Sequence, residues 1–369
     1  MLSYILPFMV VIVVVVFIHE YGHYYFAKRY GVGVTDFSIG FGKEIFGWND
    51  KSGTRWKVCV IPLGGYVKFF GDRNVYSQAD NEKIIKDYNK EDQDKLFVLK
   101  PLYQRALIVL GGPLANFVLA ILIFFSIYTF AGKDFTPAVI NEVQKGSPAM
   151  VAGLKSNDII VSIDNNKVKS IMEVSKFIMM STDEFINFTV DRFDQNISFK
   201  VKPNIIESED NLGNKINKRM VGIKLGAYNN EVNHVKLGPA KAFFYAVNEV
   251  YYVSVSSLKY IGSMIVGSGD SSQLGGPIRI AKISGQVAEF GILPFISLMA
   301  YISISLGLIN LFPIPMLDGG HLMFYGIEKV LGRPLSQKTQ EGFFRIGIFL
   351  LLSLMFFTTF NDLKDVGLF

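Results

Sequence analysis

The sequence is poor in cysteine and in charged side chains. Its single cysteine, Cys59, excludes a disulfide within the chain and any pair of cysteines for metal binding or redox chemistry. Charged residues make up 19% of the 369 residues, whereas hydrophobic residues reach 50% and the mean hydropathy is +0.31. A water-soluble domain has more charge than this. These values predict a membrane protein.

Features that nucleic acids and nucleotides require are also missing. The net charge of +5 is small, and no long run of lysine and arginine is present to follow a phosphate backbone. No glycine-rich phosphate-binding loop follows a strand pattern. We therefore expect neither a nucleic-acid partner nor a nucleotide cofactor.

Four stretches carry no charged side chain, namely residues 1–18, 106–132, 290–317 and 346–361. A transmembrane helix needs about 20 apolar residues, and uncharged runs this long are rare in soluble cores. The first stretch has no basic residue before it and no small-residue cleavage site, so we do not expect a signal peptide. Residues 242–266 are aromatic but include Glu249 and Lys259, which predicts an amphipathic or re-entrant helix, with a fifth span as the alternative.

Basic residues predict how these segments cross the membrane. They follow the first segment, precede the second, and lie between the third and fourth: Lys28, Arg29, Lys95, Lys100, Arg105, Lys329, Arg333, Lys338 and Arg345. The positive-inside rule then places the amino terminus and residues 133–289 outside the cytoplasm, and residues 28–105 and 318–345 inside.

Two regions outside the spans have the patterns of small folded units. Residues 33–72 alternate apolar and polar side chains around Gly64 and Gly65, which predicts a β-sheet with a glycine turn, and a polar connection (74–95) follows. Residues 136–226 predict an α+β domain, with strands near Val139–Val143 and Ile159–Ile163, a helix near Met172–Met180 and a hairpin around Asn204–Arg219.

The expected fold class is a membrane α-helical protein of about four transmembrane helices, with a small membrane-associated β-sheet and an inserted α+β domain. We divide the chain into transmembrane helix 1 (1–27), a cytoplasmic-side sheet region with its polar connection (28–104), transmembrane helix 2 (105–132), an extracytoplasmic domain (133–235), an amphipathic or re-entrant segment (236–289), transmembrane helix 3 (290–317), a cytoplasmic-side loop or helix (318–342) and transmembrane helix 4 (343–361).

The first apolar segment ends in His19-Glu20-Tyr21-Gly22-His23. Residues i and i+4 share one face of a helix, so both imidazoles can bind one metal ion while Glu20 reaches the water bound to it. Catalytic zinc sites use three protein ligands and leave the fourth position to water. Ionisable side chains at membrane depth are costly, so this cluster indicates a bound ion. The alternative is that the two histidines bind no metal and only extend their rings to the membrane interface.

Asp318 is the best candidate for the third ligand. It is the first acid after the uncharged stretch 290–317, and Pro313 and Pro315 break the helix before it. Irregular backbone at membrane depth is tolerated only where it is buried in protein or lines a polar cavity. His321 is a competing ligand, although its place beyond two glycines fits better a group that supports the ligands or caps a helix.

With these motifs the sequence resembles the site-2 protease family of intramembrane zinc metalloproteases, in particular the bacterial RseP-like branch with a periplasmic PDZ domain. The resemblance covers nearly the whole chain through several ordered motifs: His19–His23, Phe37–Lys43, Ile61–Lys68, Gly111–Phe117, Gly146–Ala149 with Ala152–Leu154 and Asp158–Ile160, Leu274–Ile278 and Asn310–Asp318. One PDZ-like domain fits between the second and third spans, whereas well-known members have two.

The resemblance implies one Zn²⁺ per chain with His19, His23 and Asp318 as ligands, Glu20 as the catalytic carboxylate, and Asn310 as a residue that holds the substrate backbone. We add Asn116, Gly64 and Gly65 as candidate substrate-binding residues; for the asparagines, hydrogen bonding between helices is the alternative. We also expect an exposed strand near Trp56–Ile61 to capture an unwound substrate by strand addition.

The expected activity is that of a zinc metalloendopeptidase that cleaves within or next to transmembrane segments, in the regulated proteolysis of substrates such as anti-sigma factors or signal-peptide remnants. We expect a monomer in the bacterial cytoplasmic (inner) membrane, with the zinc site towards the cytoplasm and single-span membrane proteins and the lipid bilayer as partners.

Two other functions stay open at this stage. A membrane scaffold would bind peptides with its PDZ-like domain and keep a non-catalytic zinc site, but a structural zinc site has four protein ligands and no use for Glu20. A transporter with broken helices would account for Pro313 and Pro315, but such proteins show repeated halves and this sequence shows none.

Overall fold

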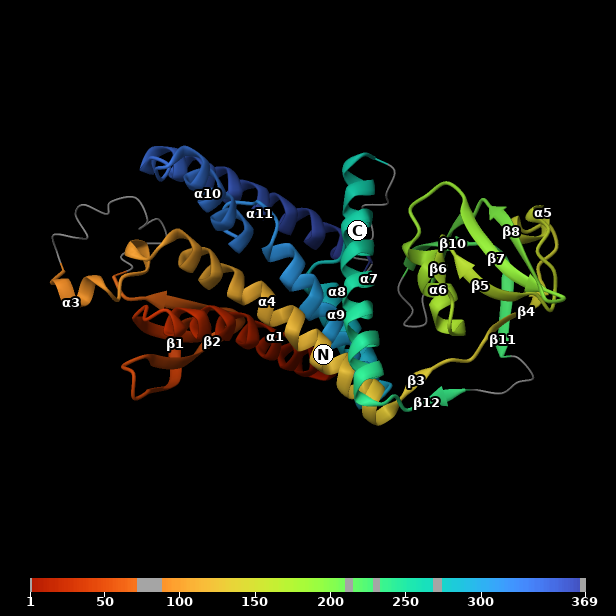
Figure 1. The fold of residues 1–369 in the computed structure, drawn as a ribbon, viewed down its shortest axis with the longest axis horizontal. Coiled ribbons are helices and arrows are strands. Elements are labelled where there is room, and N and C mark those ends of the chain that lie inside the picture. Colours follow the sequence, from red (N-terminus) through yellow and green to blue (C-terminus); the bar gives the residue numbers. More distant parts are fainter. Residues whose placement is uncertain (1, 72–87, 210–214, 228–232, 268–273, 366–369) are drawn as a thin grey trace. The chain divides into compact units, whose positions relative to one another are not determined.

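The computed structural model describes residues 2–71, 88–209, 215–227, 233–267 and 274–365, and it divides into two compact units (Figure 1). Unit 1 combines Met1–Ile123 with Gly275–Lys364, and unit 2 is formed by Phe124–Leu274. Most of the expected polar connection 74–95 lies outside the described residues; its described end contains the short helix α3 (Lys90–Gln93), and the 3-10 turn η2 (Phe97–Leu99) follows.

Among the described residues, four helices are long and apolar enough to cross a membrane. The four segments are Ser3–Arg29 in α1 (Leu2–Arg29), Leu102–Ala131 in α4 (Leu102–Ser126) with the π-helical turn η3 (Ile127–Ala131), Ile292–Asn310 in α9 (Ile292–Asn310), and Lys338–Lys364 in α11 (Gln337–Asp365). This agrees with the four expected spans. The last helix begins earlier than its uncharged core suggested, because polar residues form its first turns.

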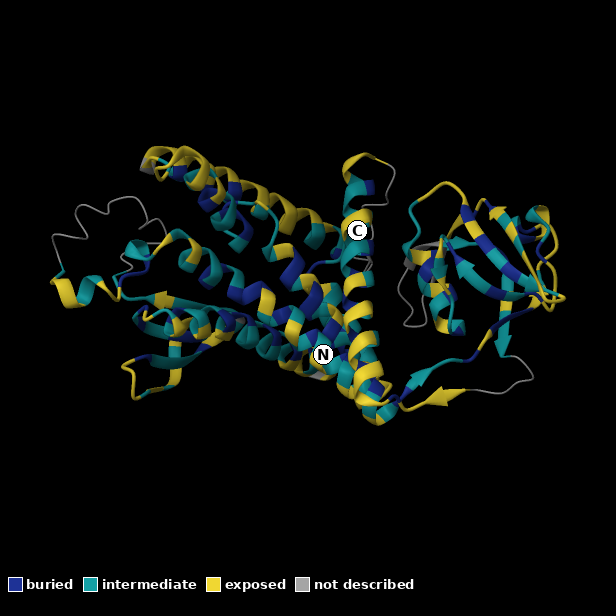
Figure 2. Ribbon diagram, in the orientation of Figure 1, coloured by how far each residue is buried: buried dark blue, intermediate teal, exposed yellow. Residues whose placement is uncertain are grey.

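The helices of unit 1 bury one face and expose an apolar one. Val11 and Val15 of α1 pack with Met299 of α9, and Ala27 and Ile108 belong to a second buried cluster. Helix α11 is largely exposed along its length, with large apolar side chains on its surface (Figure 2). Exposed apolar area of this extent is unfavourable in water, so it is consistent with a helix surrounded by lipid.

Strands β1 (Val34–Asn49) and β2 (Arg55–Phe69) form the sheet of unit 1. Residues 36–39 of β1 have register partners in two parts of β2, at 55–58 and at 65–68, so both strands fold back on themselves. The bends lie at glycines, because Gly40, Gly42 and Gly64 all have positive φ. The expected glycine turn is therefore confirmed.

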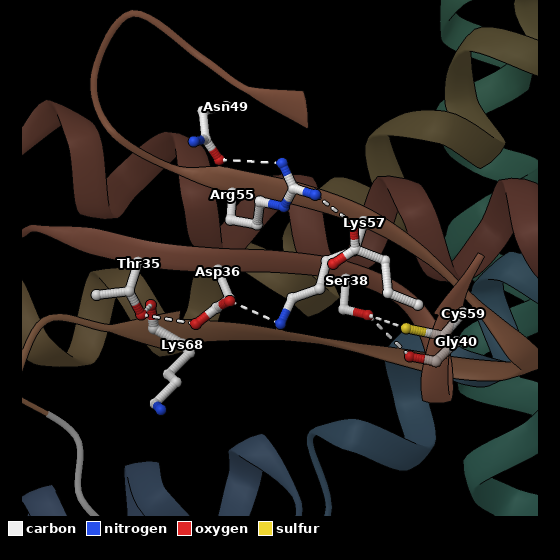
Figure 3. A network of polar contacts seen from close by, with 10 residues as sticks. Thr35, Asp36, Ser38, Gly40, Asn49, Arg55, Lys57, Cys59 and Lys68 are labelled. Carbon is white, nitrogen blue, oxygen red and sulfur yellow. Dashed lines mark hydrogen bonds and ion pairs between the residues drawn. The ribbon is translucent and has the colours of Figure 1, made fainter. Parts of the chain in front are cut away.

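The expectation of a free strand near Trp56–Ile61 is wrong for most of that stretch. Residues 55–58 pair with 36–39 on one side and with 46–49 on the other, so their backbone groups are already used. Polar contacts also fix this stretch, since Lys57 pairs with Asp36 at 2.6 Å and Cys59 lies 3.3 Å from the hydroxyl of Ser38 (Figure 3). Residues 65–68 have register partners on one side only among the described residues.

Unit 2 contains the expected α+β domain. Its main sheet has the order β11-β4-β5-β7-β8, with β6 paired to β5, and α6 (Ile171–Met180) packs on it. The elements are β3 (Lys133–Asp134), β4 (Ala138–Val143), α5 (Pro148–Ala152), β5 (Ile159–Ile163), β6 (Asn166–Lys167), β7 (Ile186–Arg192), β8 (Gln195–Val201), β9 (Asn204–Glu209), β10 (Lys215–Met220), β11 (Ile223–Ala227) and β12 (His234–Val235). The predicted strands, helix and β9–β10 hairpin are confirmed.

The segment expected as one amphipathic unit, 236–289, contains two helices that belong to different units. Helix α7 (Pro239–Ile265) belongs to unit 2, where Glu249 pairs with Lys176 of α6; it is not among the four candidate spans. Helix α8 (Pro277–Glu289) belongs to unit 1 and contacts α1 and α9. The start of α8 is held by Asp362 of α11, whose carboxylate accepts hydrogen bonds from three backbone N–H groups.

Candidate active site

Helix α1 supplies two imidazoles on one face, as the four-residue spacing predicts. The ring centres of His19 and His23 lie 4.9 Å apart, and their Nε2 atoms are separated by 3.3 Å. The Nδ1 atom of His23 lies 2.9 Å from the backbone carbonyl oxygen of Ile108 in α4. Because a carbonyl only accepts, Nδ1 carries the proton, and Nε2 of a neutral His23 has its lone pair free for a metal.

Asp318 is the first residue of α10 (Asp318–Leu331), and its carboxylate faces both imidazoles. One carboxylate oxygen, Oδ2, lies 3.2 Å from Nε2 of His19, and the other, Oδ1, lies 3.5 Å from Nε2 of His23. His19, His23 and Asp318 each offer one ligand atom, and these atoms all lie within 4.8 Å of one another. Asp318 is brought to the histidines although it lies far from them in the sequence.

The geometry of these three side chains fits a zinc ion. A tetrahedral ion with bonds of about 2.0–2.2 Å keeps neighbouring donor atoms about 3.3–3.6 Å apart, and the two Nε2 atoms are separated by 3.3 Å. The two carboxylate oxygens of Asp318 each face one imidazole, at 3.2 Å from His19 and 3.5 Å from His23. Oδ2 of Asp318 is buried and has no hydrogen-bond partner among the described residues. A buried carboxylate beside two imidazoles needs a compensating positive charge, which a bound metal cation would supply.

The loop before α10 folds against the first turn of that helix, and glycines make this possible. A Cβ on Gly319 would lie 2.2 Å from the carbonyl oxygen of Phe312, and one on Gly320 would lie 2.4 Å from that of Ile314. Helix α11 approaches the same loop, because a Cβ on Gly347 would lie 2.1 Å from the carbonyl oxygen of Pro315. These close approaches hold Asp318 in place, and they explain the glycines that follow it.

Glu20 lies beside the candidate metal ligands and contacts β2. Its carboxylate accepts a hydrogen bond from the backbone N–H of Val67. A Cβ on Gly65 would lie 2.9 Å from Cγ of Glu20 and 2.7 Å from the carbonyl oxygen of Ser38, so only glycine lets the strand come this close. Glu20 is not part of the metal-binding group found among the described residues, which leaves its carboxylate available as a base.

Helix α4 passes close to the histidines because glycines line its contact with α1. A Cβ on Gly22 would lie 2.1 Å from the carbonyl oxygen of Gly111, so the two backbones are in direct contact. A Cβ on Gly112 would lie 2.3 Å from Nε2 of His23 and 2.8 Å from Cε1 of His19. The sequence motif Gly111-Gly112-Pro113 pointed to this helix, but the role of Gly112 beside the ligands was missed.

Asn116 lies one turn further along α4 and is fully buried. Its side-chain amide is 3.2 Å from Nδ1 of His19, and the hydroxyl of Ser303 in α9 donates to its backbone carbonyl at 2.9 Å. It therefore contacts a candidate ligand directly, which was not foreseen when it was considered for substrate binding.

The remaining predicted site residues are not among the three side chains of the metal-binding group. Asn310 is the last residue of α9 and is partly exposed, and Gly64 lies at the bend of β2, where a Cβ would lie 2.4 Å from the ring of Phe41. His321 is outside the metal-binding group, and its ring lies 5.7 Å from that of Phe344. Of the two proposed third ligands, the structure brings Asp318 to the histidines.

Comparison with known proteins gives a consistent result. The family model described as Peptidase family M50 matches residues 7–354. A protein of Agrobacterium fabrum, named as a candidate zinc metalloprotease, is 41% identical over 99% of this chain and 96% of its own length. A similarly named protein of Rickettsia conorii is 36% identical over 98% of this chain and 99% of its own, and the metalloprotease MmpA of Caulobacter vibrioides is 34% identical over 97% of this chain and 95% of its own.

Proposed function

The chain belongs to peptidase family M50, and we propose that the peptide bonds it hydrolyses lie within or next to the transmembrane segments of other membrane proteins. The family and the names of the relatives support a metalloprotease whose cofactor is zinc. We further propose one zinc ion per chain, held by His19, His23 and Asp318, and a location in the bacterial inner membrane.

One observation carries the proposal that cleavage occurs in the membrane. His19 and His23 lie inside Ser3–Arg29, a helix whose length and composition suit a membrane span. Asp318 follows Ile292–Asn310, a second such helix, after a short loop. A peptidase with its ligands on membrane-spanning helices meets substrates that are themselves in the bilayer. Such a substrate has to unwind locally, because the hydrogen bonds of an intact helix shield its peptide bonds.

The chain's own residues account for proton transfer and orientation. Zinc, when bound, supplies a Lewis acid that polarises the scissile carbonyl and lowers the pKa of water to about 7. A carboxylate oxygen of Glu20 takes the proton from the attacking water and delivers it to the leaving amine. The N–H of Val67 fixes the orientation of Glu20, and the carbonyl of Ile108 fixes that of His23.

The free side of β2 is the best place for the unwound substrate. Among the residues that the structure describes, 65–68 pair with 36–39 on one side only. Gly65 packs against Glu20 at the edge of the site, and the N–H of Val67 is directed to Glu20, so the other backbone groups of this side are the ones left for a substrate. A substrate segment that adds to this strand would have its backbone aligned next to the catalytic carboxylate. Asn310, at the end of α9, is proposed to hold freed backbone groups of the same segment.

The domain at 136–226 is proposed to be PDZ-like, to lie outside the cytoplasm, and to exclude substrates with bulky outer domains. Its six-stranded antiparallel sheet with α6 suits a domain that binds extended peptides. Replacing 136–226 by a short linker should preserve hydrolysis and extend it to substrates with folded outer domains. A deletion protein that folds, retains zinc and cleaves nothing would contradict this filter role.

The proposed function is tested by comparing cells that express the wild-type protein with cells that express Glu20→Gln. Mass spectrometry of membrane fractions should show single-span proteins that accumulate only with the variant, and wild-type cells should contain new peptide ends within or next to their spans. The loss of a general base typically costs 10²–10⁴-fold in rate, and zinc should stay bound because Glu20 is not a ligand.

His23→Ala serves as the second variant, since it should lose zinc as well as activity. If the Glu20-dependent peptide ends lie only in soluble domains, the protein is a metalloprotease but its substrates are not cleaved in the membrane. If Glu20→Gln cleaves as fast as the wild-type protein, the catalytic assignment is wrong.

A further inference from the structure

Each imidazole of the site has a second nitrogen, Nδ1, which points away from the other ligands. For His23 the partner of Nδ1 is the carbonyl oxygen of Ile108, which can only accept. For His19 the partner is the side-chain amide of Asn116, at 3.2 Å. An amide can donate through its nitrogen or accept through its oxygen, so the two histidines differ in how firmly their proton is placed.

We propose that Asn116 is a positioning residue that holds His19 in its zinc-binding form by accepting a hydrogen bond from Nδ1. The inference rests on the proposed zinc site, since it concerns the state of His19 as a ligand. It also revises the role of Asn116, which we had considered for substrate binding.

The chemistry of the ligand decides how the amide is oriented. Nε2 of His19 faces Asp318 and His23, so a metal would bond there and Nε2 must keep its lone pair. The proton of the neutral ring is then on Nδ1, which needs an acceptor. In the present orientation the amide nitrogen of Asn116 faces Nδ1, and the amide oxygen has no hydrogen-bond partner among the described residues.

A half-turn of the amide exchanges these two atoms and leaves the shape of the side chain unchanged. Because the amide oxygen has no hydrogen-bond partner among the described residues in the present orientation, counting hydrogen bonds does not favour that orientation. Zinc binding requires one of the two orientations, because the Nε2 lone pair is available to the ion only when the amide oxygen faces the protonated Nδ1.

The surroundings of Asn116 suit a fixed orienting group. Its side chain is fully buried, and its backbone carbonyl accepts from Ser303 of α9, so the residue is anchored where α4 meets α9. Gly307 of α9 is also close, because a Cβ there would lie 3.4 Å from Cβ of Asn116. Full burial makes the side-chain amide slow to change orientation, which is useful for fixing a metal ligand, whereas the hydrogen bond from Ser303 reaches only the backbone carbonyl and does not set that orientation.

The test measures zinc affinity in purified full-length protein by competition with a chromophoric chelator. Asn116→Leu, which has a similar volume and no acceptor, should bind zinc about 10–100-fold more weakly, as is typical when a supporting partner of a ligand is lost. Asn116→Asp restores an acceptor and should bind zinc at least as tightly as the wild-type protein. Asn116→Ala also lacks an acceptor and is measured in parallel, so that the test can still be made if the leucine variant does not fold.

Ser303→Ala is the matched control, because it removes a buried hydrogen bond to the backbone of Asn116 and leaves the amide in place. Its zinc affinity should equal that of the wild-type protein. The proposal is overturned if Asn116→Leu and Asn116→Ala bind zinc normally, or if Asn116→Asp is no better than they are. Normal zinc affinity with an increased KM would instead return Asn116 to substrate binding.

His19→Ala separates this inference from the proposed function. If His19→Ala loses zinc while Asn116→Leu retains it, the zinc site stands and the role of Asn116 is wrong. If His19→Ala retains zinc at wild-type affinity, the ligand assignment itself is wrong, whatever the Asn116 variants do.

Discussion

Replacing Gly112 by alanine should remove most of the bound zinc by adding a single methyl group. The new Cβ would lie 2.3 Å from Nε2 of His23 and 2.8 Å from Cε1 of His19. Carbon and nitrogen atoms pack at about 3.5 Å, so the imidazole of His23 or the helix has to move by about 1 Å. Zinc–ligand distances tolerate only about 0.2 Å, and a 1 Å misplacement costs about 100-fold in rate.

Zinc content per chain is measured by elemental mass spectrometry after gel filtration, together with the rate of cleavage. Gly326→Ala is the matched control: Gly326 is an interior residue of α10, and a Cβ there has no neighbour within 4 Å. It should keep its zinc and gain about 0.5–1 kcal/mol of stability, the usual benefit of alanine over glycine within a helix. A Gly112→Ala protein with wild-type zinc content and rate would refute the close approach of α4 to the histidines.

Three further predictions concern stability. Asp362→Asn should lower the thermal midpoint, since one amide oxygen replaces two carboxylate oxygens that accept three N–H groups at the start of α8; an unchanged midpoint would contradict the cap. Glu328→Gln should cost about 1–3 kcal/mol, because it removes the counter-charge of Arg105 between α4 and α10 although Arg105 keeps its hydrogen bond to the carbonyl of Lys100; the loss should be absent if Arg105 is already replaced by Met. Burial opposes the charge of Asp50, but hydrogen bonds from Trp56 and its other partners hold the pKa of that carboxyl below its ordinary value. The contribution of Asp50 to the free energy of unfolding is therefore complete above about pH 4 and is lost on further acidification. Asp50→Asn should therefore flatten the acid limb of a pH–stability curve, and an unchanged limb would refute this contribution.

Much of the fold could be predicted because its signals are local. A run without charge predicts a span wherever it lies in the chain, and the four runs coincide with α1, α4, α9 and α11. Alternation and glycines predicted the β1–β2 sheet and its bend at Gly64. The pairing partners of 55–58 could not be predicted, because a strand that folds back twice meets its neighbours through bends that the alternation pattern does not encode.

The sequence alone identified the side chains of the candidate metal site. The spacing of His19 and His23 sets two imidazoles on one helix face, and the acid that ends a long uncharged stretch, Asp318, completed a zinc-type donor set. These features depend on helix geometry and on the cost of charge in a membrane, so they can be predicted from the sequence.

Only the tertiary structure decided how that chemistry is held. The contacts of Ile108 and Asn116 with the imidazoles, and of Val67 with Glu20, join elements distant in sequence. The fit of Gly112 beside the ligands depends on how closely α4 packs on α1. A residue's type shows which hydrogen bonds it can make, but the packing of helices selects the partner that it meets.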